Sequence, residues 1–268
     1  MVLLMNKKIL LIVEGKKAEP KFFNKLQEEF NLEFDIYCFE TNIYSLYKIM
    51  EDNDFNVNIK DILLELHPEQ KELLSNTFLY TYLIFDLDPH HTKKDDTRSI
   101  EQIVNDNVEK VKEMASYFVD ETDPTVGKLY INYPMMESYK ACNSFFDNDY
   151  MHEAISINEL SNFKEYVGEK KLSNIRIDKY SKDNFKKLIV QNIFKMNFIF
   201  NSQWKMPNYS DYLIESDTKQ ILSRENIIIT KSKQISVLNT SVLIIVDYYG
   251  NKDGFYTNLY IEFENQTD

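Results

Sequence analysis

The first 150 residues alternate short apolar runs with segments whose apolar residues recur at helical spacing. Runs rich in β-branched and aromatic residues predict four buried strands, at 7–13, 34–39, 79–85 and 128–134. Apolar stripes with a period of about 3.6 predict helices after the first strand, at 43–50 and at 100–118. Alternation of this kind favours a parallel sheet covered by helices. We therefore expect an α/β fold with a four-stranded parallel sheet flanked by helices.

The second half of the chain has a different pattern. Beyond Asp147 the strand signals fade and helical periodicity returns, at 157–167, 184–200, 209–222 and 237–248. We therefore expect a catalytic domain at residues 1–147, with a helical insertion at about 51–76. Residues 148–268 are expected to form a mainly helical subdomain.

Composition narrows the class of protein. The 18 Tyr and 18 Phe among 268 residues are expected to fill much of the core. Cys38 and Cys142 are too few for a disulfide framework and are expected to be reduced. The N-terminus places its charge after a very short apolar stretch, unlike a signal peptide, and no run approaches the roughly 20 apolar residues that span a bilayer. These features predict a soluble, cytoplasmic protein without a membrane segment.

Charge is unevenly distributed along the chain. The net charge of −12 argues against nonspecific coating of nucleic acid. Between Ser161 and Lys205, however, ten Lys or Arg face four Asp or Glu, which gives this stretch a local charge of +6. Such a segment is compatible with a nucleic-acid contact, and equally with a solvated helical face.

Carboxylates occur where three of the predicted strands end. Glu14 follows the first strand, with Glu19 five residues later. Asp86 and Asp88 follow the third strand, and Glu137 follows the fourth. In open α/β sheets the carboxyl ends of the strands form the ligand-binding edge. Carboxylates that meet there repel one another unless a divalent cation neutralises them. The pattern therefore predicts a site for Mg²⁺ or Mn²⁺.

Each of these acids also has an ordinary structural explanation. Glu14 precedes Gly15 and fits a tight turn, and the Asp-x-Asp pair fits turn chemistry or helix capping. Glu19 and Glu137 fit acids at helix N-termini. The combination favours metal chemistry, because two ions could activate a water and stabilise the leaving oxygen of a phosphodiester. Since alternate residues of an extended segment face the same way, both aspartates of the pair are expected to reach a cation. No Cys/His spacing indicates zinc.

Three further residues near these acids are weaker candidates. His90 and His91 lie just past the Asp pair and could contact phosphate or transfer a proton, although loop histidines usually do neither. Lys140 lies one turn beyond Glu137 and could neutralise charge in the transition state. A solvated lysine explains it as well.

Two motifs carry a resemblance to a known family. Leu-Ile-Val-Glu14-Gly15-x-x-x-Glu19, followed by Leu-Ile-Phe-Asp86-x-Asp88, resembles the toprim fold of topoisomerases, bacterial primases and OLD-family nucleases. The variant Glu-Gly-Lys-Lys-Ala-Glu-Pro-Lys-Phe-Phe, with the later Asn-Tyr-Pro-Met-Met-Glu-Ser-Tyr, is closer to the RloB-like and abortive-infection toprim proteins. That group also resembles the toprim effector of the PARIS phage-defence system. The resemblance covers roughly residues 7–140.

The resemblance implies Mg²⁺-dependent cleavage of nucleic acid, either tRNA or DNA, by a toxic effector of anti-phage defence. In toprim nucleases the first Glu and the Asp-x-Asp bind metal, which carries over to Glu14, Asp86 and Asp88. Glu19 and Glu137 match subgroup positions with less defined roles. An ATPase of the ABC or SMC type often accompanies such proteins. It would be a separate chain here, because the sequence has no P-loop. The substrate and the oligomeric state stay open, with a homodimer as one form of the active protein.

Two other functions compete with the nuclease. Phe85-Asp86-Leu87-Asp88 also resembles the Asp-x-Asp of haloacid-dehalogenase phosphatases, in which Asp86 would be the nucleophile and Asp88 a general acid. That fold usually carries the pair on its first strand, whereas a whole βαβ unit precedes it here. The third alternative is a toprim-like module whose acids only organise a partner interface. We favour the nuclease, because Glu14 has no role in a phosphatase.

Overall fold

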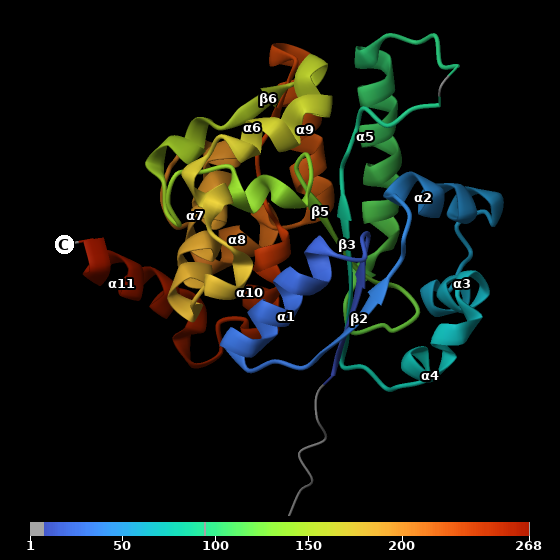
Figure 1. The fold of residues 1–268 in the computed structure, drawn as a ribbon, viewed down its shortest axis with the longest axis horizontal. Coiled ribbons are helices and arrows are strands. Elements are labelled where there is room, and N and C mark those ends of the chain that lie inside the picture. Colours follow the sequence, from blue (N-terminus) through green and yellow to red (C-terminus); the bar gives the residue numbers. More distant parts are fainter. Residues whose placement is uncertain (1–7, 94, 268) are drawn as a thin grey trace, which may run out of the picture.

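A five-stranded sheet forms the centre of the molecule, with strand order β2-β1-β3-β5-β4 (Figure 1). The computed structural model describes residues 8–93 and 95–267, and side chains as far as residue 261. The strands are β1 (Ile9–Val13), β2 (Phe34–Cys38), β3 (Tyr80–Asp86), β4 (Val119–Asp120) and β5 (Gly127–Asn132). The pairs β1–β2, β1–β3 and β3–β5 are parallel. The predicted α/β class and the mainly parallel sheet are therefore confirmed.

The sheet also contains an antiparallel strand that the apolar pattern does not predict. β4 has only two residues, both exposed, and it pairs with the start of β5. An edge strand this short has no alternation of apolar and polar positions from which it could be recognised. The sheet is consequently mixed, with four parallel strands and one antiparallel strand at its edge.

Helices of the first half follow the predicted pattern closely. They are α1 (Ala18–Phe30), α2 (Ile43–Asp52), α3 (Ile59–Leu66), η1 (Pro68–Gln70), α4 (Lys71–Leu74) and α5 (Ile100–Tyr117). α1 buries the apolar stripe that includes Phe22 and Leu26. Asn42 caps the N-terminus of α2, and its side chain accepts a hydrogen bond from the backbone N–H of Ser45. α3 lies within the helical insertion expected at about 51–76.

The second half is mainly helical, as expected, but its elements differ in detail. They are η2 (Met136–Lys140), η3 (Asn148–His152), β6 (Ala154–Ser156), η4 (Ile157–Asn162), α6 (Phe163–Gly168), η5 (Lys171–Asn174), η6 (Ile177–Lys179), α7 (Lys182–Asn201), α8 (Tyr209–Glu215), α9 (Thr218–Ser232), β7 (Gln234–Ser236), η7 (Ser241–Leu243), α10 (Ile244–Tyr249), η8 (Lys252–Gly254) and α11 (Phe255–Thr267). The helix predicted at 209–222 is two helices, because the side chain of Asp217 caps a new one at the backbone N–H of Gln220. The expected late helix at 237–248 is confined to η7 and α10. β6 and β7 form a small antiparallel pair.

The helices lie on both sides of the sheet. Figure 1 shows α1, α7 and α10 on one side and α2, α3 and α5 on the other. Both faces of the central strands are therefore covered, and every residue of β1 is buried. This burial explains why β1 has a continuous apolar run with no alternation.

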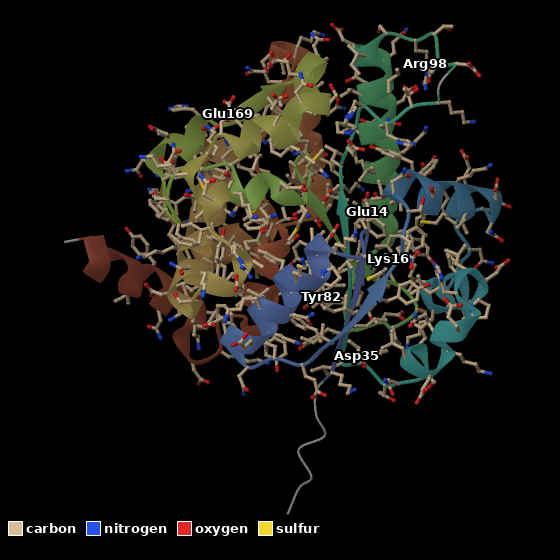
Figure 2. All side chains as sticks on the ribbon, in the orientation of Figure 1. Glu14, Lys16, Asp35, Tyr82, Arg98 and Glu169 are labelled. Carbon is tan, nitrogen blue, oxygen red and sulfur yellow. The ribbon has the colours of Figure 1, made fainter. Side chains whose placement is uncertain are left out.

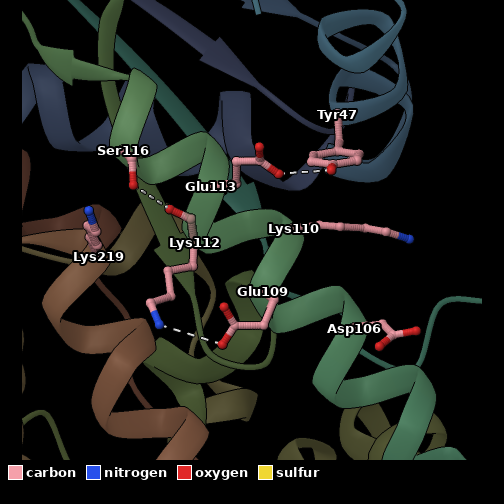
Figure 3. A pocket seen from close by; sticks show the side chains of 8 residues that line it. All are labelled: Tyr47, Asp106, Glu109, Lys110, Lys112, Glu113, Ser116 and Lys219. Atoms are coloured by element: carbon pink, nitrogen blue, oxygen red, sulfur yellow. Dashed lines mark hydrogen bonds and ion pairs between the residues drawn. The ribbon is translucent and has the colours of Figure 1, made fainter. Parts of the chain in front are cut away.

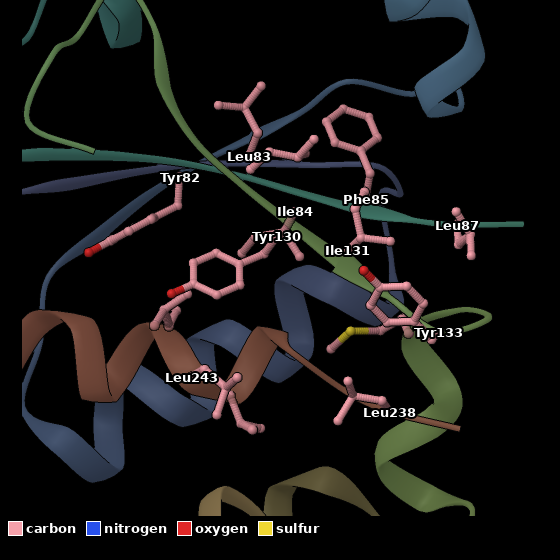
Figure 4. Close-up of a cluster of buried hydrophobic side chains, with 14 of the residues drawn as sticks. Tyr82, Leu83, Ile84, Phe85, Leu87, Tyr130, Ile131, Tyr133, Leu238 and Leu243 are labelled. Carbon is pink, nitrogen blue, oxygen red and sulfur yellow. The ribbon is translucent and has the colours of Figure 1, made fainter. Parts of the chain in front are cut away.

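The second half packs directly on the sheet. Leu238 forms an antiparallel bridge with Tyr133 just beyond β5, and Figure 4 shows Leu238 and Leu243 on the same side of β5 as Tyr130 and Tyr133. The hydroxyl of Thr240 donates to the carbonyl oxygen of Ile131 at 2.8 Å. Residues from both halves belong to a single hydrophobic core. The division at residue 147 stays a prediction.

No helix in the described part of the chain is long and apolar enough to cross a membrane. Cys38 and Cys142 are both free thiols.

Candidate functional site

Glu14 and Asp86 meet at the carboxyl edge of the sheet. Val13 pairs with Ile84 across the β1–β3 ladder, so the ends of these two strands lie side by side. Glu14 Oε2 accepts a hydrogen bond from the backbone N–H of Asp86 at 3.2 Å. Figure 2 shows Glu14 at this edge and Asp35 at the opposite end of the sheet. The strands themselves thus bring together the two acids on which the predicted metal site most depends.

Asn132 supports Asp86 from the neighbouring strand. The two residues are register partners in β5 and β3, and Asn132 Nδ2 donates to Asp86 Oδ1 at 3.3 Å. Asn132 Oδ1 in turn accepts from the hydroxyl of Ser241 at 2.8 Å. A segment from the second half of the chain therefore helps to orient Asp86. Sequence reasoning missed Asn132, although a polar residue within an apolar strand end was a usable signal.

Glu19 is buried beside the turn that follows β1. Its Oε1 accepts a hydrogen bond from the backbone N–H of Gly15 at 3.2 Å. A Cβ atom at position 15 would lie only 2.8 Å from Glu19 Oε2, so a larger residue here would displace this carboxylate from its present position. Glu19 also lies in the first turn of α1, where a negative charge is favourable. The prediction that Glu19 is an acid at a helix N-terminus is therefore confirmed, and its functional role stays a prediction.

The Asp-x-Asp segment turns rather than staying extended. β3 ends at Asp86, and Asp88 has a φ of 35°, in the left-handed region. The expectation that alternation along a strand makes both aspartates face the same way is therefore wrong. Asp88 is held by its own backbone N–H, which donates to the carbonyl oxygen of Pro134 at 2.9 Å. His90 Nδ1 lies 3.0 Å from Asp88 Oδ1, so the histidine's nearest charged neighbour is this acid.

Glu137 reaches the same neighbourhood from η2. The structure contains only a 3₁₀ turn here, so the helix predicted to begin at Glu137 is wrong. Lys164 of α6 places Nζ 3.2 Å from Glu137 Oε1. Burial lowers the pKa of Lys164, but the charges of Glu137, Asp86 and Glu19 outweigh it and raise that pKa overall. Lys140 is half-buried with Nζ over the ring of Tyr139, and burial lowers its pKa.

The carboxylates act on one another electrostatically. Burial raises the pKa of Glu14 to about 7, against the lowering effect of the Asp86 backbone N–H, and the charges of Asp88 and Glu19 raise it further. Burial also raises the pKa of Asp86 well above its usual range, and Glu14, Glu137 and Glu19 add to that rise. The charges of Asp88, Glu19 and Glu137 therefore all act on Glu14 or Asp86, the two acids at which the charged form is disfavoured.

The fit of a divalent cation can be tested on these donors. Within residues 8–93 and 95–267, no group of three or more His, Cys, Asp or Glu is arranged to hold a metal ion. Mg²⁺, however, is commonly bound by only one or two carboxylates, with waters and substrate phosphates completing its shell. Glu14 and Asp86 offer such a pair of hard oxygen donors. Asp88 offers a further oxygen donor at this edge, with His90 Nδ1 3.0 Å from its Oδ1.

No family model, curated protein or solved structure matches this chain. The toprim resemblance consequently depends on the motifs quoted above and on the placement of their residues.

Proposed function

We propose that this protein is a cytoplasmic, Mg²⁺- or Mn²⁺-dependent nuclease of the toprim type. The observation that carries the proposal is the pair of half-buried carboxylates, Glu14 and Asp86, at the ends of adjacent parallel strands. Both have raised pKa values, and the charges around them are mainly carboxylates. A structural role does not account for this arrangement, because a buried pair of like charges destabilises the folded state.

Glu14 and Asp86 would hold the ion, with Asp88 beside them. The ion would supply an activated water and stabilise negative charge on the phosphate. In the hydrolysis, water oxygen attacks phosphorus, the bond from phosphorus to the leaving oxygen breaks, and the leaving oxygen takes up a proton. Asn132 orients Asp86, and the N–H of Gly15 orients Glu19. The exposed ammonium of Lys164 is placed to attract a phosphate oxygen.

The wider setting of this activity follows from the resemblance alone. It comprises tRNA or DNA as substrate, a role as the toxic effector of phage defence, and control by an ATPase of the ABC or SMC type. The phosphatase and the non-catalytic module gain no specific support from the geometry. The nuclease is the function to test first.

The test is cleavage of total tRNA and of plasmid DNA with Mn²⁺ and with a chelator. We expect cleavage by the wild type in Mn²⁺ and a loss of at least about 100-fold in Glu14→Gln, because removing an interaction worth about 3 kcal/mol in the transition state has that effect. Asp35→Asn is the matched control, since it makes the same chemical change at the opposite end of the sheet. Full cleavage by Glu14→Gln, or none by the wild type on either substrate, would refute the proposal.

A further inference from the structure

A second pocket lies directly beside the acidic edge. It has a volume of about 380 Å³ and is enclosed by α2, the start of α5 and the loop between β3 and α5. The loop residues that line it begin at His91, three positions after Asp88. The backbone N–H of His91 donates to the carbonyl oxygen of Asp88 at 3.0 Å, which closes a tight turn between the two sites. Such a turn brings the two Cα atoms to within about 7 Å.

An aromatic wall forms one side of this pocket. The rings of Tyr44 and His91 are stacked, with centroids 5.3 Å apart and planes 6° from parallel. Tyr44 Oη donates to the carbonyl oxygen of Leu87, between the two aspartates of the motif. Asn107 Nδ2 donates to the carbonyl oxygens of Pro89 and His91 at 2.9 and 2.8 Å. Hydrogen bonds therefore hold both Tyr44 and the segment with His91 in place next to the Asp-x-Asp motif.

His91 itself is exposed, and among the described residues Tyr44 is the only ring that stacks on it. Asn42 Nδ2 lies 3.5 Å from Nδ1 and 3.4 Å from Nε2 of His91, and the part of the exposed imidazole that neither Tyr44 nor Asn42 covers is available to a further planar group. Because His90 contacts Asp88, His91 is the better candidate in this loop for contacting a ligand.

The charge of the pocket is positive in a chain that is strongly negative overall. Four basic residues line it against two acidic ones, Glu51 and Asp96. Arg98 is neutralised, because its Nη2 lies 2.6 Å from Asp96 Oδ2. The other three are lysines, and none of them forms an ion pair with a carboxylate of the described residues: Lys48, Lys93 and Lys110.

A neighbouring pocket shows that this imbalance is not general. It has a volume of about 510 Å³ and shares Tyr47 and Lys110 with the first (Figure 3). There Lys112 Nζ lies 3.5 Å from Glu109 Oε1, and Tyr47 Oη donates to Glu113 Oε2 at 2.9 Å. Figure 3 shows Lys110 extending away from these pairs. Three basic and three acidic residues line the larger pocket, whereas basic residues outnumber acidic ones in the smaller pocket.

We propose that the smaller pocket binds one nucleotide of a single-stranded nucleic acid. The base stacks on His91, and Lys48, Lys93 and Lys110 surround the phosphate. Stacking on an aromatic side chain and a basic groove are the two elements of single-strand binding. The inference rests on the proposed nuclease function, because the turn from Asp88 to His91 places a nucleotide in this pocket next to a phosphodiester at the acidic edge.

The test measures binding in a chelator, so that no cleavage can occur. The probe is a fluorescein-labelled single-stranded oligonucleotide of mixed sequence, as DNA and as RNA, followed by fluorescence anisotropy. We expect His91→Ala to weaken binding at least about 5-fold, since stacking contributes roughly 1–3 kcal/mol per base. His91→Phe keeps a planar ring and is expected to bind within about 3-fold of the wild type. Asp35→Asn, at the opposite end of the sheet, is expected to keep full binding.

The lysines are tested by salt dependence, which a purely structural role would not change. Removing a lysine that neutralises one phosphate of a single strand lowers the slope of log affinity against log salt by about 0.7. Lys48→Ala/Lys110→Ala is therefore expected to reduce that slope by about 1.4. Lys71→Ala/Lys231→Ala, at two exposed lysines elsewhere, is expected to leave it unchanged. Equal thermal melting of the variants confirms that each one folds.

The two proposals fail in different ways. If His91→Ala and the Lys48/Lys110 variant bind as the wild type does, the nucleotide subsite is refuted, even when cleavage depends on Glu14. If the wild type cleaves nothing in Mn²⁺ but binding depends on these residues, the subsite stands and the nuclease is refuted. An equal loss of binding in the Lys71/Lys231 control would also refute the subsite, because a lysine anywhere on the surface would then contribute as much as one in the pocket.

Discussion

The two ends of the central sheet hold buried charge in opposite ways. At the amino end of β5, Asp247 accepts hydrogen bonds from the Lys128 ammonium and the Tyr130 hydroxyl. At the carboxyl end, Glu14 and Asp86 lie together, and their hydrogen bonds come from a neutral backbone N–H and a neutral amide. A paired buried charge is explained by the fold that it holds together. Like charges that are buried together need another reason, and a ligand that neutralises them is the reason that we propose.

Burial and neighbouring charges shift the pKa in opposite directions at the paired end, but in the same direction at the acidic edge. Burial lowers the pKa of Lys128, but the charge and hydrogen bond of Asp247 outweigh it and raise that pKa overall. The ion pair is therefore formed throughout the neutral range. At the other end, burial and the surrounding acids both oppose ionisation of Asp86. The charges at the paired end are neutralised within the chain, and we propose that a bound cation neutralises those at the acidic edge.

The largest change in unfolding free energy is expected from breaking the ion pair between Asp247 and Lys128. Asp247→Ala leaves the Lys128 ammonium, whose side chain is only 22% exposed, without its partner. Removing one member of a buried ion pair costs about 3–5 kcal/mol of unfolding free energy, because the other charge stays desolvated. Urea denaturation measures the loss. Asp35→Ala, which breaks an ion pair with the more exposed Lys8, is expected to cost at most about 1 kcal/mol. Equal losses in the two variants would contradict the comparison.

Sequence patterns predicted the acidic edge because that edge depends on buried strands. The apolar runs before Glu14 and Asp86 fixed where β1 and β3 end, and parallel pairing then placed the two acids side by side. The residues that complete the edge could not be found in this way. Lys164 arrives from a helix far along the chain, and Ser241 reaches Asn132 through tertiary packing. No local period encodes such contacts.

The remaining errors have equally physical causes. The predicted helix at 237–248 combined apolar residues that the fold divides among an isolated bridge at Leu238, the 3₁₀ helix η7 and the short helix α10. Asn239 and Thr240 are buried there by hydrogen bonds to the carbonyl oxygens of Met136 and Ile131. Asp88 departed from strand alternation because the chain turns after Leu87. In both places a tertiary contact decided the backbone, and propensity did not.

A smaller effect is expected from completing the unpaired end with metal. A ligand that binds only the folded state at 100 times its dissociation constant stabilises that state by about 2.7 kcal/mol. We therefore expect Mn²⁺ to raise the melting temperature of the wild type by several degrees relative to a chelator. Glu14→Gln should lose that rise, and Asp35→Asn should keep it. A rise that is the same in all three proteins would place the ion elsewhere and would remove the reason proposed for the acidic edge.

The smallest effect concerns a carboxylate that is buried alone. Glu215 of α8 lies far from the acidic edge in the sequence and is 4% exposed. Burial raises its pKa from 4.5 to about 7, against the lowering effect of the hydrogen bond from Asn201, and the charge of Asp211 raises it further. Glu215 thus separates the effect of burial from the effect of a cluster of acids.

The sign of the pH dependence follows from that direction. Because the folded-state pKa lies above the unfolded value, the protonated carboxyl stabilises the protein fully below pH 4.5, and this contribution is lost as the pH rises through about 7. Glu215→Gln cannot ionise, and its amide oxygen can still accept from Asn201. The unfolding free energy of Glu215→Gln relative to the wild type should therefore rise between pH 4.5 and pH 7 by about 1–3 kcal/mol, and then stay constant. Urea denaturation at a series of pH values measures the difference. Glu169→Gln, at an exposed position (Figure 2), should show no such rise. A flat difference for Glu215→Gln would mean that burial alone does not disfavour a carboxylate in this protein, and the acidic edge would then owe its character to mutual repulsion.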